Sequence, residues 1–302
     1  MSRTAVCVAL FAAVALAQPA SPTAAAPAQP LAHFHHLHLN TTDPQAAIDF
    51  YTKHFNCERG KFAGAVDAVW AQKSWILFTK VDQPPPSDIL STIWHFGWGA
   101  PDMPKEYQRQ LDMGAKFETP ITDISDIGGN TGAKGLFYFA YVESPDHALI
   151  ELNTSRNDRF GHIHLLSADP IATGEWYARH FGIPNVRYQR ETRVYRGVHI
   201  GPSASFTLDN VNVIIYPAEY ARDSWPKLWG ERSGFESTKG RAVDHIGLSV
   251  DNLDATVQRL KSEGITITDG PRTALGGKVK LAFIEGPDKM RIELVEGQAT
   301  KE

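Results

Sequence analysis

The pattern of apolar and polar positions repeats along the chain. Four short apolar segments each carry a histidine near the start, and an Asp or Asn follows that histidine by seven positions. Asp and Asn side chains accept hydrogen bonds from the free amides of a first helical turn, so each segment predicts a strand, a turn and a helix. The pairs are His36 and Asp43, His95 and Asp102, His162 and Asp169, and His245 and Asn252.

The predicted helices divide the four units into two alternating types. In the first and third units an aromatic pair begins 14 residues after the histidine, at Phe50 and at Trp176. In the second and fourth units a glycine stands 19 residues after the histidine, at Gly114 and Gly264. Glycine at such a position can end a helix in a left-handed turn. Short β-rich stretches follow each helix, so every unit is predicted to be a βαβββ module.

The second and fourth modules close on the same motif. A Pro-Asp turn at Pro145 and at Pro287 leads into a final strand with the sequence Ile-Glu-Leu. The first and third modules, which we call odd, thus alternate with the second and fourth, which we call even. This order predicts an α+β protein of four βαβββ modules in two tandem domains. These domains cover residues 31–152 and 159–297, and the polar segment 153–158 links them.

The N-terminal residues predict export. Arg3 precedes the apolar run 5–17, which ends in a small-residue cleavage site, so residues 1–17 are expected to be a signal peptide. Residues 18–30 are rich in Ala and Pro and predict an extended leader. The run is shorter than the roughly 20 residues that span a bilayer, and no later stretch is apolar enough. We therefore expect a secreted or periplasmic protein without a membrane span.

Composition removes several function classes. With 42% hydrophobic residues the 302-residue chain cannot be largely disordered, and a net charge of −4 gives no basic footprint for nucleic acid. Removal of the signal peptide would leave Cys57 as the single cysteine, which excludes an internal disulfide. The twelve histidines are many for this length, and four of them lead the modules.

Two glutamates in the final strands point to metal chemistry. A carboxylate that faces a sheet interior costs several kcal/mol unless a cation compensates it. Two imidazoles and a carboxylate form the facial triad that holds Fe(II) with open positions, and Mn(II) or Zn(II) also accept these ligands. Grouped by sequence half, the ligand sets are His36, His95 and Glu151, and His162, His245 and Glu293. If instead the first module pairs with the fourth, and the second with the third, the sets become His36, His245 and Glu293, and His95, His162 and Glu151.

A single histidine at a strand start is usually a surface or capped residue, and only the repeated register favours ligands here. His38 and His164 lie two positions beyond His36 and His162. Because side chains alternate along a strand, they share the face of the leading histidines. They are therefore candidates for groups that support the metal or face the substrate.

The modules resemble the vicinal oxygen chelate superfamily, which includes glyoxalase I, bleomycin-resistance proteins and extradiol dioxygenases. The resemblance covers almost all of residues 32–297 and rests on the histidine-to-cap spacing, the aromatic pairs and the two Pro-Asp endings. It implies paired modules that form two tandem glyoxalase/dioxygenase-type open barrels. It also implies a divalent metal, Fe(II) in the dioxygenases, that chelates adjacent oxygens of a small substrate.

The family patterns match in part. Extradiol dioxygenases carry a tyrosine four residues before the final proline, where this chain has Tyr141 in the second module and Phe283 in the fourth. Their upstream histidine is replaced by the segment 274–276 in the fourth module. Glyoxalase I would require an acid in the last strand of the odd modules, but segments 75–79 and 213–217 have none.

The sequence therefore predicts an exported, metal-dependent enzyme, nearer the dioxygenases than the glyoxalases. Tyr141, His38 and His164 are its candidates for proton transfer. The alternative is a non-catalytic protein of the same fold that sequesters a small ligand. Assembly into homo-oligomers stays open.

Overall fold

The computed structural model describes residues 31–301. The predicted signal peptide 1–17 and leader 18–30 lie outside the described residues. Within residues 31–301, no helix combines the length and the apolar character needed to cross a bilayer.

The described chain forms two eight-stranded mixed sheets. The first has the order β14-β15-β16-β13-β1-β4-β3-β2. Its strands are β1 (His33–Thr41), β2 (Glu58–Phe62), β3 (Val66–Ala71), β4 (Ser74–Lys80), β13 (Val243–Val250), β14 (Ile267–Ala274), β15 (Val279–Glu285) and β16 (Arg291–Glu296).

The second sheet repeats this arrangement with the order β10-β11-β12-β9-β5-β8-β7-β6. Its strands are β5 (Ile93–Ala100), β6 (Phe117–Asp123), β7 (Tyr138–Glu143), β8 (Leu149–Thr154), β9 (Phe160–Ser167), β10 (Arg187–Tyr195), β11 (Val198–Leu208) and β12 (Val211–Pro217). The α+β class and the four βαβββ modules are confirmed.

The leading strands of the modules decide how the modules pair. At the centre of the first sheet β1 runs antiparallel to β13, and at the centre of the second β5 runs antiparallel to β9. The first module therefore shares a sheet with the fourth, and the second with the third. Each sheet thus takes one module from each half of the sequence.

Four helices follow the leading strands at the predicted positions. They are α1 (Pro44–His54), α2 (Met103–Asp112), α3 (Pro170–Phe181) and α6 (Leu253–Ser262). The side chains of Asp43, Asp102, Asp169 and Asn252 each accept a backbone amide of the first turn, as the seven-residue spacing predicts. Gly114 and Gly264 both have φ of +85°, the left-handed conformation that glycine tolerates best.

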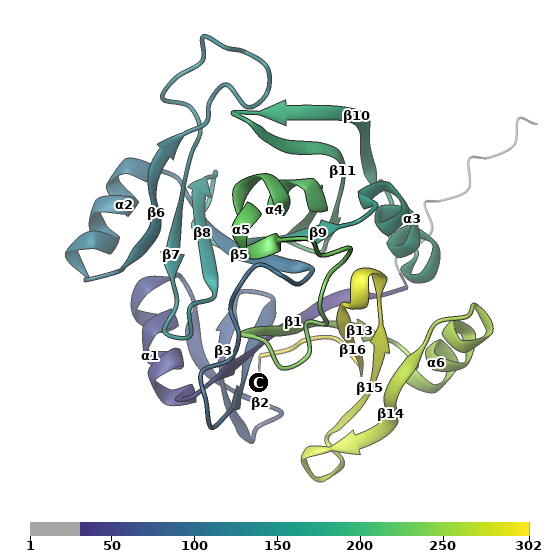
Figure 1. The fold of residues 1–302 in the computed structure, drawn as a ribbon. Helices are drawn as coiled ribbons and strands as arrows, with labels where there is room; N and C mark the ends of the chain where they lie inside the picture. The colour runs from purple at the N-terminus through teal and green to yellow at the C-terminus, as the bar shows by residue number, and fades with distance from the viewer. Residues whose placement is uncertain (1–30, 302) are drawn as a thin grey trace, which may run out of the picture.

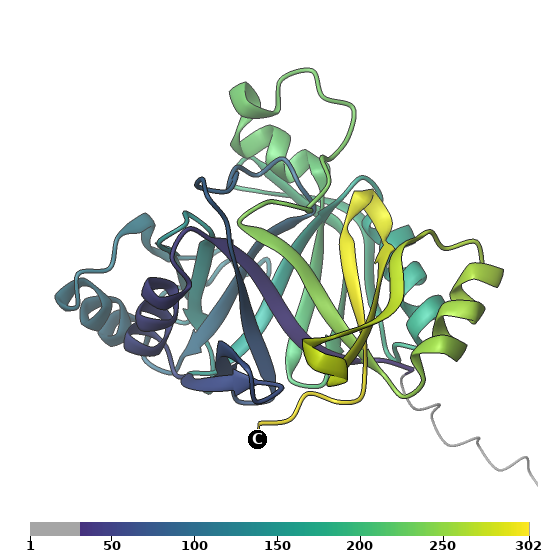
Figure 2. The same ribbon diagram turned by 90° about the horizontal axis from the view of Figure 1, so that it is seen from below.

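The helices pair within the sequence halves, although the sheets pair across them. Figure 2 shows α1 beside α2 on one flank of the sheets and α3 beside α6 on the other. A buried histidine near the C-terminus of α1 and another near that of α3 join the helices of each pair. His54 Nδ1 lies 2.7 Å from Gln110 Oε1, and His180 Nδ1 lies 2.6 Å from Glu263 Oε2. His54 and His180 thus have a structural role, because each joins the end of its own helix to the neighbouring helix.

One segment departs from the repeat. Helices α4 (Ala218–Ser224) and α5 (Pro226–Trp229) stand between the third and fourth modules and pack over the second sheet (Figure 1). The short helices η1 (Leu275–Gly277) and η2 (Pro287–Lys289) flank β15.

A continuous buried core joins the two sheets, with Phe34 and Phe160 6.0 Å apart between ring centroids.

Candidate metal centres

The six predicted ligands gather into two clusters, each at the middle of one sheet. His36 on β1 meets His245 on β13 and Glu293 on β16, while His95 on β5 meets Glu151 on β8 and His162 on β9. His38 and His164 join these clusters. We call His36, His38, His245 and Glu293 centre one, and His95, Glu151, His162 and His164 centre two.

The grouping of the histidines by sequence half is therefore wrong, and the alternative grouping is the one that the fold makes. His95 and His36 lie in different sheets, as do His162 and His245. The physical reason is the antiparallel pairing of β1 with β13 and of β5 with β9, which places leading histidines from opposite halves beside each other.

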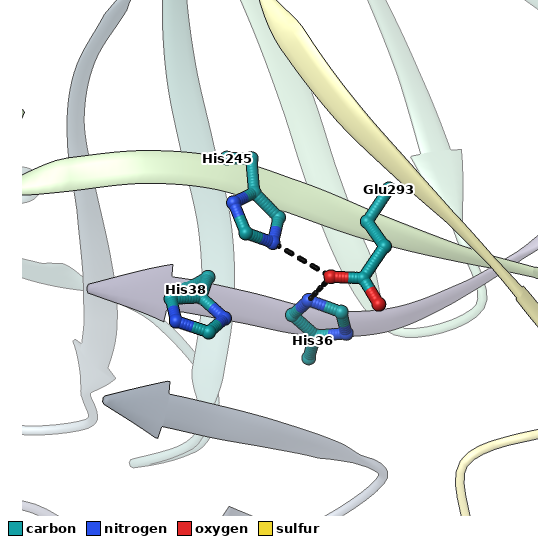
Figure 3. Close-up of side chains that lie close together, drawn as sticks. All are labelled: His36, His38, His245 and Glu293. Carbon is teal, nitrogen blue, oxygen red and sulfur yellow. Dashed lines mark hydrogen bonds and ion pairs between the residues drawn. The ribbon is translucent and has the colours of Figure 1, made fainter. Parts of the chain in front are cut away.

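Centre one is held by a carboxylate between imidazoles. His245 Nε2 lies 2.9 Å and His36 Nε2 3.5 Å from the same Oε2 atom of Glu293. The ring of His38 stacks on that of His245, with centroids 4.5 Å apart and planes inclined by 24°. Figure 3 shows all four side chains converging from three strands.

One ring nitrogen of each imidazole in centre one contacts a side chain outside the cluster. His245 Nδ1 is 2.5 Å from Asp244 Oδ1, and His36 Nδ1 is 2.8 Å from His35 Nδ1. His38 Nε2 is 2.8 Å from Thr79 Oγ1. Such partners set the tautomer and orientation of a ligating histidine. Sequence reasoning missed Asp244, for which a carboxylate directly before the leading histidine was the available signal.

Centre two reproduces this geometry with fewer supports. His95 Nε2 lies 2.9 Å from Glu151 Oε2, and His162 Nε2 lies 3.6 Å from Glu151 Oε1. His164 stacks on His95 at 4.4 Å and 22°. Trp94 occupies the position that Asp244 has in centre one, and His95 Nδ1 has no hydrogen-bond partner among the described residues.

Burial and contacts within the cluster set the charge states of centre one. Burial lowers the pKa of His36 and His38, so both imidazoles are neutral. Burial works against the charge of Glu293, but the adjacent His245 and His36 hold its pKa well below the usual range. Burial would also lower the pKa of His245, yet its hydrogen bonds to Asp244 and Glu293 raise it.

The histidines of centre two are neutral as well. Burial lowers the pKa of His162 to about 4 and takes those of His95 and His164 well below their ordinary value. A neutral imidazole offers a lone pair, which is the form that metals bind.

Unpartnered nitrogens mark both centres as fit for a divalent ion. Within residues 31–301, buried nitrogen atoms without a hydrogen-bond partner include His36 Nε2, His38 Nδ1, His162 Nε2 and His164 Nδ1. A buried polar atom without a partner costs about 1–3 kcal/mol, and a cation at the centre would remove that cost. The imidazole and carboxylate donors suit Fe(II), Mn(II) or Zn(II) alike.

A cavity of about 460 Å³ opens onto centre one. Its lining includes His38, His245 and Glu293, together with Phe283 and the Arg291 side chain. The guanidinium of Arg291 lies over the Phe283 ring, 3.8 Å from its centroid, and binds Asp244 Oδ1 at 2.6 Å. The cavity is large enough for a small molecule and places it directly beside the candidate ligands.

Tyr141, the third predicted catalytic residue, lies beside centre two. It is opposite Glu151 in the β7–β8 register, and its ring centroid is 4.9 Å from that of His95. Burial and the nearby charge of Glu151 raise its pKa well above 10, so the phenol keeps its proton. In centre one the equivalent position opposite Glu293 is Phe283.

A sequence profile of the Glyoxalase/Bleomycin resistance protein/Dioxygenase superfamily matches residues 33–152 and 159–294. The chain belongs to this superfamily. The two matched segments correspond to the two halves of the repeat, so each family unit contributes one module to each sheet.

Curated relatives of this chain include proteins named lactoylglutathione lyase. The protein from Haemophilus influenzae is 36% identical over 62 residues, which are 20% of this chain and 46% of that protein. The protein from Salmonella typhimurium is 37% identical over 70 residues, 23% of this chain and 50% of that protein. The matched segments thus span about half the length of these curated relatives.

Among solved structures, glyoxalase I from Zea mays has the same fold. It superposes with a TM-score of 0.63 over 88% of this chain and 93% of the maize chain, at 14% sequence identity.

Proposed function

We propose that this protein is a metal-dependent enzyme that binds two adjacent oxygens of a small substrate at a divalent ion. The carrying observation is the cluster of three buried imidazoles and one carboxylate, built twice with nearly the same distances between imidazole nitrogens and carboxylate oxygens. A bound ion would act as a Lewis acid toward those oxygens and stabilise the charge that develops on them.

Centre one is the proposed site of the reaction. His36, His245 and Glu293 would hold the ion there, and Asp244 keeps the proton of His245 on Nδ1 so that Nε2 faces the ion position. The cavity beside these residues would orient the substrate between Phe283 and the ligands. The histidines of centre two lack comparable supporting contacts within the described residues, so its affinity for metal is expected to be lower.

The proposed reaction class is that of a lyase or isomerase. Relatives named lactoylglutathione lyase favour it. The dioxygenase hypothesis is the less favoured form of the proposal, because Phe283 and the segment 274–276 cannot transfer a proton at centre one.

Metal analysis of the purified protein tests the proposal. The wild type is expected to hold up to two equivalents of a divalent transition metal, and Glu293→Gln is expected to lose one of them. Glu285→Gln, an exposed carboxylate on β15, is the matched control and should keep both. Assays for lactoylglutathione lyase and for oxygen uptake with a catechol then separate the two reaction classes.

Equal metal content in the wild type and Glu293→Gln would contradict the assignment of centre one. Tight binding of a small ligand by metal-free protein, with no turnover in either assay, would favour sequestration instead.

A further inference from the structure

We propose that His38 and His164 are themselves metal ligands, so that three histidines and one glutamate hold each ion. This inference rests on the proposed function, because it extends the ligand sets of the same two centres. It replaces the proton-transfer role that the sequence suggested for these two residues.

The register of the four modules shows how the extra donor arises. In each module, the residue two positions after the leading histidine lies beside one fixed position of that module's last strand. In the even modules this pair is a glycine beside a glutamate, and in the odd modules it is a histidine beside an apolar residue. The pairs are Gly97 with Glu151, Gly247 with Glu293, His38 with Leu77, and His164 with Ile214.

The odd modules thus have no carboxylate at this position of the last strand and carry an imidazole on the first strand instead. The two differences from the even modules occur together in both odd modules. Because the neighbouring strands are hydrogen-bonded at that register, a side chain from either strand can extend toward the same centre. The donor missing from Leu77 and Ile214 is therefore supplied by His38 and His164.

The even modules have no room for such a donor. A Cβ atom at Gly247 would overlap the His36 ring, and one at Gly97 would overlap the His162 ring and the Glu151 carbonyl oxygen. Glycine at these two positions lets the leading histidine of the partner module enter the centre. Only the odd modules can therefore carry a second imidazole two residues after the leading histidine.

The orientation of His38 is that of a ligand. Its Nε2 is engaged by Thr79 Oγ1, while its Nδ1 is buried without a partner within the described residues. That Nδ1 lone pair is available if the ring proton is on Nε2, where the Thr79 oxygen accepts it. Donor atoms of His38 and of the other three residues all lie within 4.8 Å of one another.

The arrangement recurs in centre two, on different strands. His164 Nδ1 is likewise buried without a partner among the described residues. The ring stacking also matches, at 4.5 Å and 24° for His38 on His245 and 4.4 Å and 22° for His164 on His95. Two independent sets of residues thus adopt one geometry.

The fourth protein ligand constrains the chemistry. Four protein ligands would leave an octahedral ion two positions for adjacent substrate oxygens. They would leave none for O₂ beside a chelated substrate. The inference therefore selects the lyase or isomerase class over the dioxygenase class.

Counting the imidazoles bound to the ion tests this directly on the wild type. X-ray absorption of the protein loaded with Co²⁺ is expected to give three imidazoles per ion, and two would overturn the inference. This measurement requires no variant and therefore does not depend on the folding of a substituted chain.

Variants of centre one give an independent test by Co²⁺ titration of metal-free protein. His38→Ala and His36→Ala should each weaken the binding of one of the two equivalents at least tenfold, while His33→Ala on the same strand is the control. The double variant His38→Gly with Leu77→Glu recreates the even-module pair and should regain most of the lost affinity. A residue that only packs against His245 would not be rescued by a glutamate on β4.

The outcomes separate this inference from the proposed function. If wild-type protein binds no divalent metal, both fail. If His36→Ala and Glu293→Gln lose metal while His38→Ala keeps wild-type affinity, only the present inference is wrong.

Discussion

At the scale of single residues, the two centres depend on glycines without a side chain as much as on the histidines and glutamates. Gly97 and Gly247 lack the side chain that would exclude a facing imidazole. Neither glycine has a positive φ, so steric room, and not backbone conformation, requires glycine there.

Gly247→Ala is therefore expected to lower the free energy of unfolding by about 1–3 kcal/mol, the usual cost of overpacking a core. It should also displace His36 and weaken metal binding at centre one alone. Gly128→Ala is the control, because a Cβ there meets nothing within 4 Å. Thermal denaturation and metal content of the two variants check this, and equal behaviour would contradict the steric role of Gly247.

At the scale of elements, each leading strand is followed at once by a capped helix, and this junction fixes where the strand ends. Asn252 Oδ1 accepts the amide of Ala255 at 2.9 Å and begins α6 two residues after β13, the strand that carries His245. The same local interaction begins α1, α2 and α3. The caps thus keep the four modules in equivalent register.

Loss of the cap on α6 should have a measurable but modest cost. Asn252→Ala is expected to destabilise the protein by about 1 kcal/mol, whereas Asn252→Asp retains an acceptor and should stay near wild type. Urea denaturation of the two variants measures the difference. An alanine variant as stable as the aspartate variant would show that the cap contributes nothing.

At the scale of the whole molecule, the two halves of the sequence are interlocked. Their helices pair within a half, through His54 and His180, while their sheets pair across the halves, through β1 with β13 and β5 with β9. Neither half contains a full set of ligands for one centre.

Residues 31–152 and 159–301, produced as separate chains, are therefore expected not to fold as monomers. Each would expose the unpaired edges of β1 and β5, or of β9 and β13, with the apolar core beneath them. Mixed together, they should form a one-to-one complex that binds metal, as measured by light scattering and metal analysis. A monomeric half that unfolds cooperatively would contradict this.

The sequence by itself determined the local structure and singled out the candidate ligands. Histidine-to-cap spacing, glycine at helix ends and the repeated Ile-Glu-Leu strands depend on interactions within a few residues, so the modules, their helices and the six candidate ligands that cluster could be predicted. Only the tertiary structure decided which modules share a sheet, because strands with equivalent apolar patterns can pair in more than one way. That choice placed His245 beside His36 and not beside His162. Gly97 and Gly247 gained their roles from histidines distant in sequence, so no local pattern could have assigned them. Asp244, by contrast, stands next to His245, and that adjacency was the one local signal for its role.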